Sequence, residues 1–162
     1  MIVLRSHAHR SIAGTAGLLA ASVCVLALSA GGASGATARA ARTISLNESG
    51  RLHLTSHHGF HLNEQGAASG TIRGSIYIHL NVSSTNRVSA EVNIYPSNGS
   101  LTGYGTAGYH PNGGVATFSG SLSISRGTGA YARAHASHLR FSGTIQRSND
   151  ATTVRLSGPL SL

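Results

Sequence analysis

Histidine is the residue type that most clearly offers chemistry in this sequence. Four histidines fall within nine residues, at His53, His57, His58 and His61. Neutral imidazoles are common ligands of zinc and copper ions, and the repeated spacing of four would suit a shared ion if the chain turned at His57-His58-Gly59. On one extended strand, residues four apart are about 13 Å from each other, too far to share an ion. The segment is therefore either a Zn or Cu site or a hairpin tip rich in histidine.

The sequence offers few acids with which a histidine could work. Its carboxylate side chains are Glu48, Glu64, Glu91 and Asp150, and each is expected at an outward-facing or turn position. His135 and His138 could add a metal ligand or a base, but no acid or nucleophile is placed beside them. A hydrolase with a Ser-His-Asp triad and a glycosidase with paired carboxylates are therefore not expected, and no catalytic residue is assigned.

The N-terminal region has the order of segments found in a secretory signal peptide. Met1 to Arg10 is basic, Ile12 to Leu28 is apolar, and small residues follow. The apolar run is interrupted by Ser, Thr and Gly and is shorter than the ~20 strongly apolar residues of a transmembrane helix. We expect a signal peptide and leader over residues 1–38, cleaved after Ala36, Ala38 or Ala40. The domain over 39–162 would then be secreted and would not span a membrane.

Composition narrows the chemistry of the exported domain. The only cysteine, Cys24, lies in the leader, which excludes thiol catalysis and a disulfide in the mature chain. All basic residues other than His are Arg, and a chain beginning at Arg39 has a net charge of +6. Such a charge favours anionic partners such as envelope polymers or lipid head groups. No nucleic-acid recognition motif accompanies it, so a specific nucleic-acid partner is not expected.

Alternation of apolar and polar residues dominates the mature chain and predicts strands with one buried face. Ile76, Ile78 and Leu80 share one parity, and Val88, Val92 and Ile94 repeat the pattern after a turn. Further inner rows are expected at Leu101, Gly103, Gly105, Ala107 and Tyr109; at Ala116, Phe118, Gly120, Leu122 and Ile124; at Leu139, Phe141, Gly143 and Ile145; and at Val154, Leu156, Leu160 and Leu162. These rows contain no acidic or basic side chain. The outward parity holds Arg51, Arg73, Arg87, Arg140 and Arg155, together with Tyr77, Tyr95 and Tyr104.

The remaining segments give weaker signals. Residues 44–47 and 52–56 are expected to be short strands joined by a Glu48-Ser-Gly turn. Residues 60–69 are expected to be a loop or an irregular edge strand, and 129–138 has the composition for one or two helical turns. Seven or eight strands with short turns favour an all-β fold, a single small antiparallel β-barrel. Inner glycines permit strong coiling, and closure removes exposed strand edges, which favours a barrel over a sandwich.

One stretch resembles a known superfamily. Phe118-Ser-Gly-Ser-Leu-Ser-Ile-Ser-Arg-Gly-Thr-Gly-Ala-Tyr, followed by Leu139-Arg-Phe-Ser-Gly-Thr-Ile, is similar to the strand and Gly-Thr-Gly turn of the allene oxide cyclase and dirigent-like barrels. The likeness covers Val115 to Leu162 and consists of turn glycines and core residues. It implies the barrel fold. The plant cyclase binds a fatty-acid epoxide inside its barrel with polar residues that include a Glu, and no Glu falls on an inner row predicted here.

The predicted function follows from these observations. We expect an exported, non-catalytic barrel that binds a small apolar ligand inside or an anionic envelope component outside. One alternative is an isomerase or cyclase-type enzyme on the same scaffold, and another is a metal binder built on His53, His57, His58 and His61. A catalytic version should bring at least one titratable group into the barrel, which separates the first two hypotheses.

Overall fold

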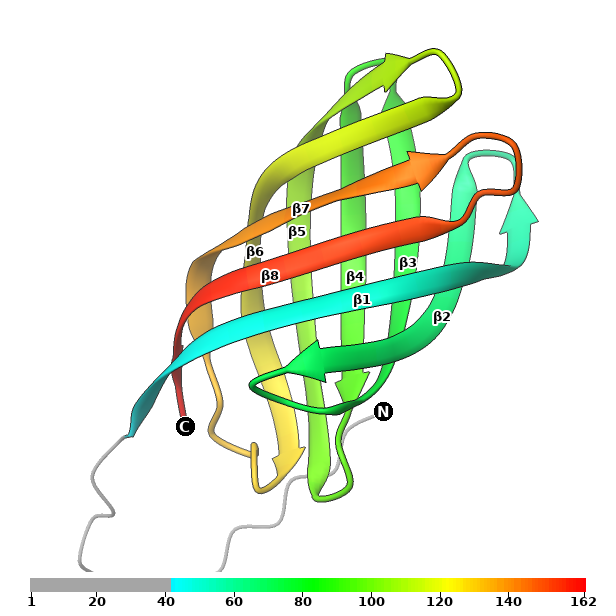
Figure 1. The fold of residues 1–162 in the computed structure, drawn as a ribbon. Helices are drawn as coiled ribbons and strands as arrows, with labels where there is room; N and C mark the ends of the chain where they lie inside the picture. Colours follow the sequence, from blue (N-terminus) through cyan, green and yellow to red (C-terminus); the bar gives the residue numbers. More distant parts are fainter. Residues whose placement is uncertain (1–41) are drawn as a thin grey trace, which may run out of the picture. The chain divides into compact units, whose positions relative to one another are not determined.

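The computed structural model describes residues 42–162, and the predicted leader over residues 1–38 lies outside them. The described residues form eight β-strands and no helix (Figure 1). In chain order these are β1 (Thr43–His58), β2 (His61–Gly70), β3 (Gly74–Ser84), β4 (Arg87–Tyr95), β5 (Gly99–Asn112), β6 (Val115–Gly129), β7 (Ala136–Gln146) and β8 (Thr152–Ser161). The predicted all-β fold is confirmed. Nothing helical in residues 42–162 has the length and apolar character to cross a bilayer.

The strands close into one antiparallel barrel, in which each strand pairs with its neighbours in the chain and β1 pairs with β8. The closing register runs from Thr43 opposite Ser161 to Leu52 opposite Thr152. The hairpins β1–β2, β3–β4, β5–β6 and β7–β8 meet at one end of the barrel, which we call the mouth (Figure 1). The start of β1 and the end of β8 lie at the other end, which we call the base.

Apolar side chains from all eight strands fill the barrel, as the alternation predicted. Leu46, Ile78, Leu101 and Leu160 are each at most 1% exposed. Phe118 on β6 and Phe141 on β7 are also buried, and their ring centroids are 5.0 Å apart. Burying one such side chain stabilises the fold by roughly 1.5–3 kcal/mol. The interior is therefore a packed hydrophobic core over most of its length.

The predicted turn at Glu48-Ser-Gly is wrong, because β1 continues through it as one strand. Leu46, Glu48, Gly50 and Leu52 all face inward, so the alternation is unbroken. A side chain at position 50 would press against Val154 and Ile76. Glycine at this inner position therefore marks close packing within a strand, although it looks like a turn signal in the sequence.

Residues 60–69 were expected to be a loop or an irregular edge strand, and this expectation is wrong as well. They contain β2, which pairs regularly with β3 from His61 opposite Asn81 to Ala68 opposite Gly74. The inner row of β2 alternates apolar, acidic and small residues, since Leu62, Glu64 and Ala68 are buried. Because that row is not uniformly apolar, the strand pattern was hidden.

The connection between β6 and β7 differs in detail from the prediction. Gly127 and Gly129 belong to the end of β6, and the turn itself follows at residues 130–133. Bonds from the N–H of Tyr131 to the carbonyl of Thr128 (3.0 Å) and from the N–H of Ala134 to the carbonyl of Tyr131 (2.8 Å) tighten it. No helix forms there. Gly129 has a φ of 58°, a left-handed conformation that glycine adopts without strain.

Candidate ligand-binding site

The barrel interior contains two carboxylates, which corrects the prediction of an interior without acidic or basic groups. Glu48 on β1 is 2% exposed and Glu64 on β2 is 1% exposed. Each lies on the inward parity of its strand, between apolar neighbours. An isolated charge in such surroundings is costly, so a buried carboxyl must find partners or bind a proton.

Glu48 lies toward the base and has partners of its own. Its Oε1 accepts a hydrogen bond from the backbone N–H of Ile72, just before β3. Burial raises the pKa of Glu48 above its ordinary value of 4.5, and contacts with the backbone of Ile72 and Thr71 offset part of this rise. Oε2 has no hydrogen-bond partner. Glu48 therefore acts mainly as a structural acceptor for the β2–β3 connection.

Glu64 lies nearer the mouth than Glu48. Burial raises the pKa of Glu64 from 4.5 to about 7; the nearby Thr152 hydroxyl offsets part of the rise, and the charge of Asp150 adds to it. That hydroxyl donates to the backbone carbonyl of Asp150 at 3.2 Å. Neither carboxylate oxygen of Glu64 has a hydrogen-bond partner of its own. A carboxyl with a pKa of about 7 can donate or accept a proton near neutral pH.

A pocket with a volume of about 670 Å³ opens at the mouth. Apolar groups from three strand regions line it: Phe60 in the β1–β2 turn, Leu62 and Val82 near strand ends, and Tyr109 on β5. Arg147 and Asp150 of the β7–β8 hairpin supply its charges, and the rest of the lining comes from His57, Gly59, Pro111 and three residues of the β3–β4 hairpin. Phe60 is 73% exposed, so most of its ring is open to solvent at the mouth.

Glu64 lies directly below this pocket. It is the next inward residue on β2 after Leu62, which lines the pocket, and successive inward residues on a strand are about 6–7 Å apart. Asp150 lines the pocket and also contributes to the raised pKa of Glu64, so the two carboxyl groups are electrostatic neighbours. A ligand that displaced Leu62 from the pocket floor would reach an unpartnered carboxyl.

No family model, curated protein or solved structure matches this chain. The resemblance of Val115 to Leu162 to the allene oxide cyclase and dirigent-like barrels therefore stays a prediction.

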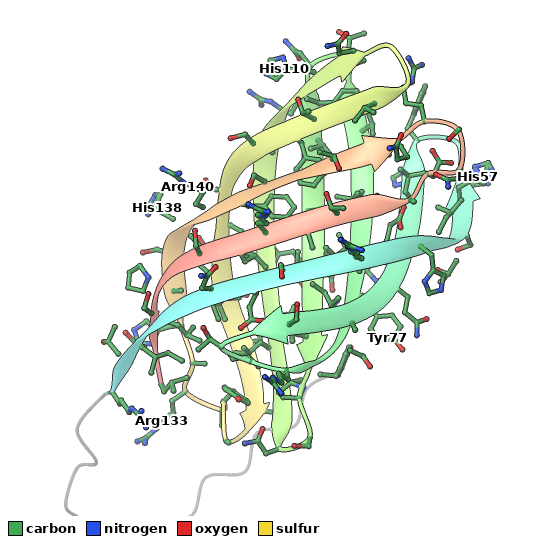
Figure 2. All side chains as sticks on the ribbon, viewed as in Figure 1. His57, Tyr77, His110, Arg133, His138 and Arg140 are labelled. Carbon is green, nitrogen blue, oxygen red and sulfur yellow. The ribbon has the colours of Figure 1, made fainter. Side chains whose placement is uncertain are left out.

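The structure separates the four histidines proposed as metal ligands. His58 and His61 face each other across the β1–β2 hairpin, whereas His53 lies opposite Gln65 further along the barrel wall. His57 is paired with Leu62 and lines the mouth (Figure 2). A register shift between Leu54 and Ser56 reverses which residues at the end of β1 face inward. Within residues 42–162 no three His, Cys, Asp or Glu side chains form a group that could hold a metal ion. The metal site stays a prediction.

The other two histidines of interest lie on the surface. His135 and His138 are both exposed, and His138 adopts a φ of 57° where β7 bulges against β6. Its side chain projects from the barrel wall beside Arg140, far from the mouth (Figure 2). Neither residue lines the mouth pocket, so neither joins the candidate site.

The five arginines expected to face outward are all exposed: Arg51, Arg73, Arg87, Arg140 and Arg155. Three of them form a diagonal row across adjacent strands. Arg155 on β8 lies opposite Ser142 on β7 and Ser49 on β1, which makes it the diagonal neighbour of Arg140 and Arg51. Diagonal neighbours of this kind are about 7–8 Å apart. We call Arg51, Arg140 and Arg155 the arginine row.

Sequence reasoning missed both interior carboxylates, although a signal for them was present. Glu48 falls on the same parity as Leu46 and Leu52, and Glu64 on the parity of Leu62 and Ala68. Extending the alternation strictly through these segments would have placed both groups inside. Glu48 was placed in a turn and Glu64 in a loop or irregular edge strand because Asn, Ser and Gly beside them are residues typical of turns.

Proposed function

We propose that this protein is an exported barrel that binds a small, largely apolar ligand at its mouth. The observation that carries the proposal is the pocket at the mouth, which has an apolar surface at Phe60, Leu62 and Val82 and carries its two charged groups together on the β7–β8 hairpin. Its volume of about 670 Å³ falls in the range of small-molecule sites, ~300–1,000 Å³. Export is the prediction drawn from the N-terminal sequence, and secretion outside the cell would give the pocket access to lipids or other envelope molecules.

The shape of the pocket supports a ligand with one polar end. Phe60, Leu62 and Val82 offer an apolar surface, while Arg147 and Asp150 offer a cation and an anion close together. Arg147 also donates to the backbone carbonyl of Gly113 at 3.2 Å, which holds its side chain across the β5–β6 hairpin. A ligand with a hydroxyl or carboxyl group could therefore be oriented at the rim while its apolar part enters the barrel.

An isomerase or cyclase is the competing function, and Glu64 is the observation in its favour. A buried carboxyl with a pKa near 7 suits proton transfer at neutral pH. Binding is nevertheless preferred, because Glu64 is 1% exposed and does not line the pocket. A catalytic acid or base has to reach the reacting atoms, and this one is covered by the pocket floor.

Blocking the mouth pocket with a bulky side chain tests the binding proposal. Native mass spectrometry of the secreted protein would first show whether a lipid or other apolar molecule copurifies. Titration with an apolar fluorescent probe such as Nile red would then compare the wild type with Val82→Trp, which fills the mouth. Ser119→Trp, on the exposed outer face of β6, is the matched control.

We expect Val82→Trp to weaken probe binding by about tenfold or more and Ser119→Trp to leave it nearly unchanged. Equal binding by both variants would overturn the mouth as the binding site. If the copurified molecule is converted to a product, and Glu64→Gln abolishes that conversion without loss of binding, the enzyme reading replaces the binding one.

The arginine row supports a second candidate, association with an anionic envelope polymer. Arg51, Arg140 and Arg155 face outward from β1, β7 and β8, and no outward carboxylate lies on these three strands. The carboxylates at Glu48 and Glu64 point into the barrel and cannot neutralise them. Arginine binds phosphate through paired hydrogen bonds, and Ser49, Ser142 and Thr153 occupy the neighbouring outward positions of the same three strands.

Charge-matched variants test this second candidate. The triple change Arg51→Gln, Arg140→Gln and Arg155→Gln removes the row, and Arg73→Gln, Arg87→Gln and Arg126→Gln removes the same charge elsewhere. We expect only the first set to weaken binding to poly(glycerol phosphate) by about tenfold and to reduce its dependence on salt concentration. An equal loss in both sets would show attraction by net charge alone and would contradict a specific surface.

A further inference from the structure

The outer face of β3 and β4 carries a hollow that neither candidate function uses. It has a volume of about 340 Å³ and is lined by Ser75, Tyr77 and His79 of β3 and by Asn93 and Tyr95 of β4. The strand register places Ser75 opposite Tyr95 and Tyr77 opposite Asn93, so the hollow spans one pair of neighbouring strands. Tyr77 projects from this side of the wall (Figure 2). We call this group of five residues the tyrosine hollow.

Two aromatic rings form one side of the tyrosine hollow. The ring centroids of Tyr77 and Tyr95 are 5.5 Å apart, and the ring planes meet at 83°, an edge-to-face arrangement that holds both rings in place. Tyr95 is 49% exposed although it belongs to a regular strand. An aromatic face that is fixed and open to solvent is a ready platform for a flat, partly apolar ligand.

A fixed polar group forms the other side. Asn93 is only 8% exposed, its Oδ1 accepts a hydrogen bond from the Thr102 hydroxyl at 2.7 Å, and its Nδ2 donates to Glu91 at 3.1 Å. These two bonds set the orientation of the amide. An amide nitrogen carries two hydrogens, so one donor of Asn93 remains for a ligand. Neighbouring His79 is held through its Nδ1 by Asn63, which leaves Nε2 available.

The aromatic side and the polar side of the tyrosine hollow together favour one class of ligand over others. A wholly apolar ligand would desolvate Asn93 and His79 without replacing their hydrogen bonds, which is costly. An anionic ligand would meet the carboxylate of Glu91, and no arginine lines the hollow to offset that repulsion. A pyranose ring satisfies both sides, because its C–H face can stack on an aromatic ring while vicinal hydroxyls pair with amide, imidazole and carboxylate groups.

We infer that the tyrosine hollow binds one sugar ring of a neutral polysaccharide outside the cell. Tyr95 supplies the stacking surface, and Tyr77 supports it edge-on. Asn93, oriented by Thr102 and Glu91, pairs with the ring hydroxyls. This site lies on the outer wall, whereas the mouth pocket lies at the barrel end, so the sugar site and the ligand proposed for the mouth are independent.

The sequence makes the site easy to observe, because the chain has five tyrosines and no tryptophan. Tyrosine fluorescence therefore reports directly on a sugar that stacks against Tyr95. Cellohexaose, laminarihexaose and the hexamer of N-acetylglucosamine serve as neutral probes, with calorimetry as the second readout. Oligogalacturonate serves as the anionic comparison.

Tyr95→Ala is the decisive variant and Tyr104→Ala its matched control, since Tyr104 is 46% exposed on β5 but does not line the hollow. We expect at least one neutral hexasaccharide to bind, with affinity reduced about tenfold or more by Tyr95→Ala and less than about twofold by Tyr104→Ala. Tyr95→Phe should keep most of the affinity, because it retains the ring.

Several results would overturn the inference. One is the absence of binding by every neutral hexasaccharide at millimolar concentration. A second is equal weakening by Tyr95→Ala and Tyr104→Ala, which would remove the site from the hollow. A third is tighter binding of oligogalacturonate than of every neutral probe. Calorimetric binding of a neutral hexasaccharide that is unchanged in Val82→Trp would show that the sugar site is independent of the mouth pocket, whether or not the mouth proposal holds.

Discussion

The backbone N–H of Ile72 donates a hydrogen bond to Oε1 of Glu48 inside the barrel. On the outer side of the same connection, the Thr71 hydroxyl accepts from the N–H of Asn47 at 3.0 Å, and the N–H of Thr71 donates to the Asn47 carbonyl at 3.1 Å. The β2–β3 connection is thus fastened to β1 from both sides of the wall. The buried acid at position 48 replaces a backbone acceptor that the strand ladder does not provide there.

Removing the Glu48 acceptor should destabilise the barrel. Glu48→Ala leaves the N–H of Ile72 unpaired and opens a cavity, which we expect to lower the free energy of unfolding by about 2–4 kcal/mol. Glu48→Gln keeps an oxygen acceptor and removes the buried charge, so its cost at neutral pH should be below about 1 kcal/mol. Chemical denaturation measures both. Equal destabilisation by the two variants would show that the charge, rather than the acceptor, matters.

Glu64 should make stability depend on pH. Because its pKa is about 7 in the folded barrel and near 4.5 when unfolded, the folded state binds more protons between these values. The contribution of Glu64 to stability is therefore fully present below about pH 4.5 and is lost as the pH rises through about 7. A pKa rise from 4.5 to about 7 corresponds to a loss on the order of 3 kcal/mol.

Glu64→Gln isolates this contribution, because a glutamine stays neutral at every pH. We expect the variant to be more stable than the wild type at about pH 8, by up to ~3 kcal/mol, and close to it at about pH 4. Denaturant titrations at a series of pH values give the comparison. Parallel pH profiles for the two proteins would contradict a buried Glu64 with a raised pKa.

Gly143 on β7 should tolerate no side chain. An added methyl group would collide with the carbonyl of Thr153 on β8 and with the ring of Phe118 on β6. We expect Gly143→Ala to lower the melting temperature sharply and to cost about 3 kcal/mol or more. Gly114→Ala in the β5–β6 hairpin is the control, since nothing lies within 4 Å of its added Cβ. Similar melting temperatures for both variants would count against the tight β6–β7–β8 packing.

Metal binding by the histidine cluster should be weak, and the hairpin tip should dominate it. His58 and His61 face each other, whereas His53 lies apart from them. In a zinc or copper titration followed by mass spectrometry, we expect His61→Ala to reduce binding and His53→Ala to have little effect. A site that used His53, His57, His58 and His61 together would instead lose the metal in the double variant His57→Ala, His61→Ala and also in His53→Ala.

The fold was largely predictable from the sequence because most inner rows are uniformly apolar. Rows such as Ile76-Ile78-Leu80 and Val88-Ala90-Val92 identify their strands by parity alone, and the turns at Thr85-Asn86 and Gly113-Gly114 lie where the strands end. Barrel closure was inferred from inner glycines. Gly143 supports that reasoning, because it allows β7, β8 and Phe118 to approach closely.

The candidate site was less predictable from the sequence than the fold was. Glu48 and Glu64 follow the inward parity of their strands, but the polar residues and glycines beside them, Gly50 and Gly66, look like turn signals and hide that parity. The bulge after Leu54 also changes the side of the strand on which His57 lies. Histidines at equal spacing in the sequence therefore do not point in the same direction. The hollow at Tyr77 and Tyr95 combines residues from two strands, and only the register β3–β4 shows them as one group.

The pairing of β1 with β8 determines when the barrel can close during synthesis of the chain. Until β8 has been made, the backbone groups of Thr43 to Leu52 that face it have no partner, and the apolar interior stays open to water. Folding must therefore wait for residues far apart in the chain, which slows it. Such a delay fits the proposed export, because a chain whose barrel has not yet closed can cross a membrane in extended form.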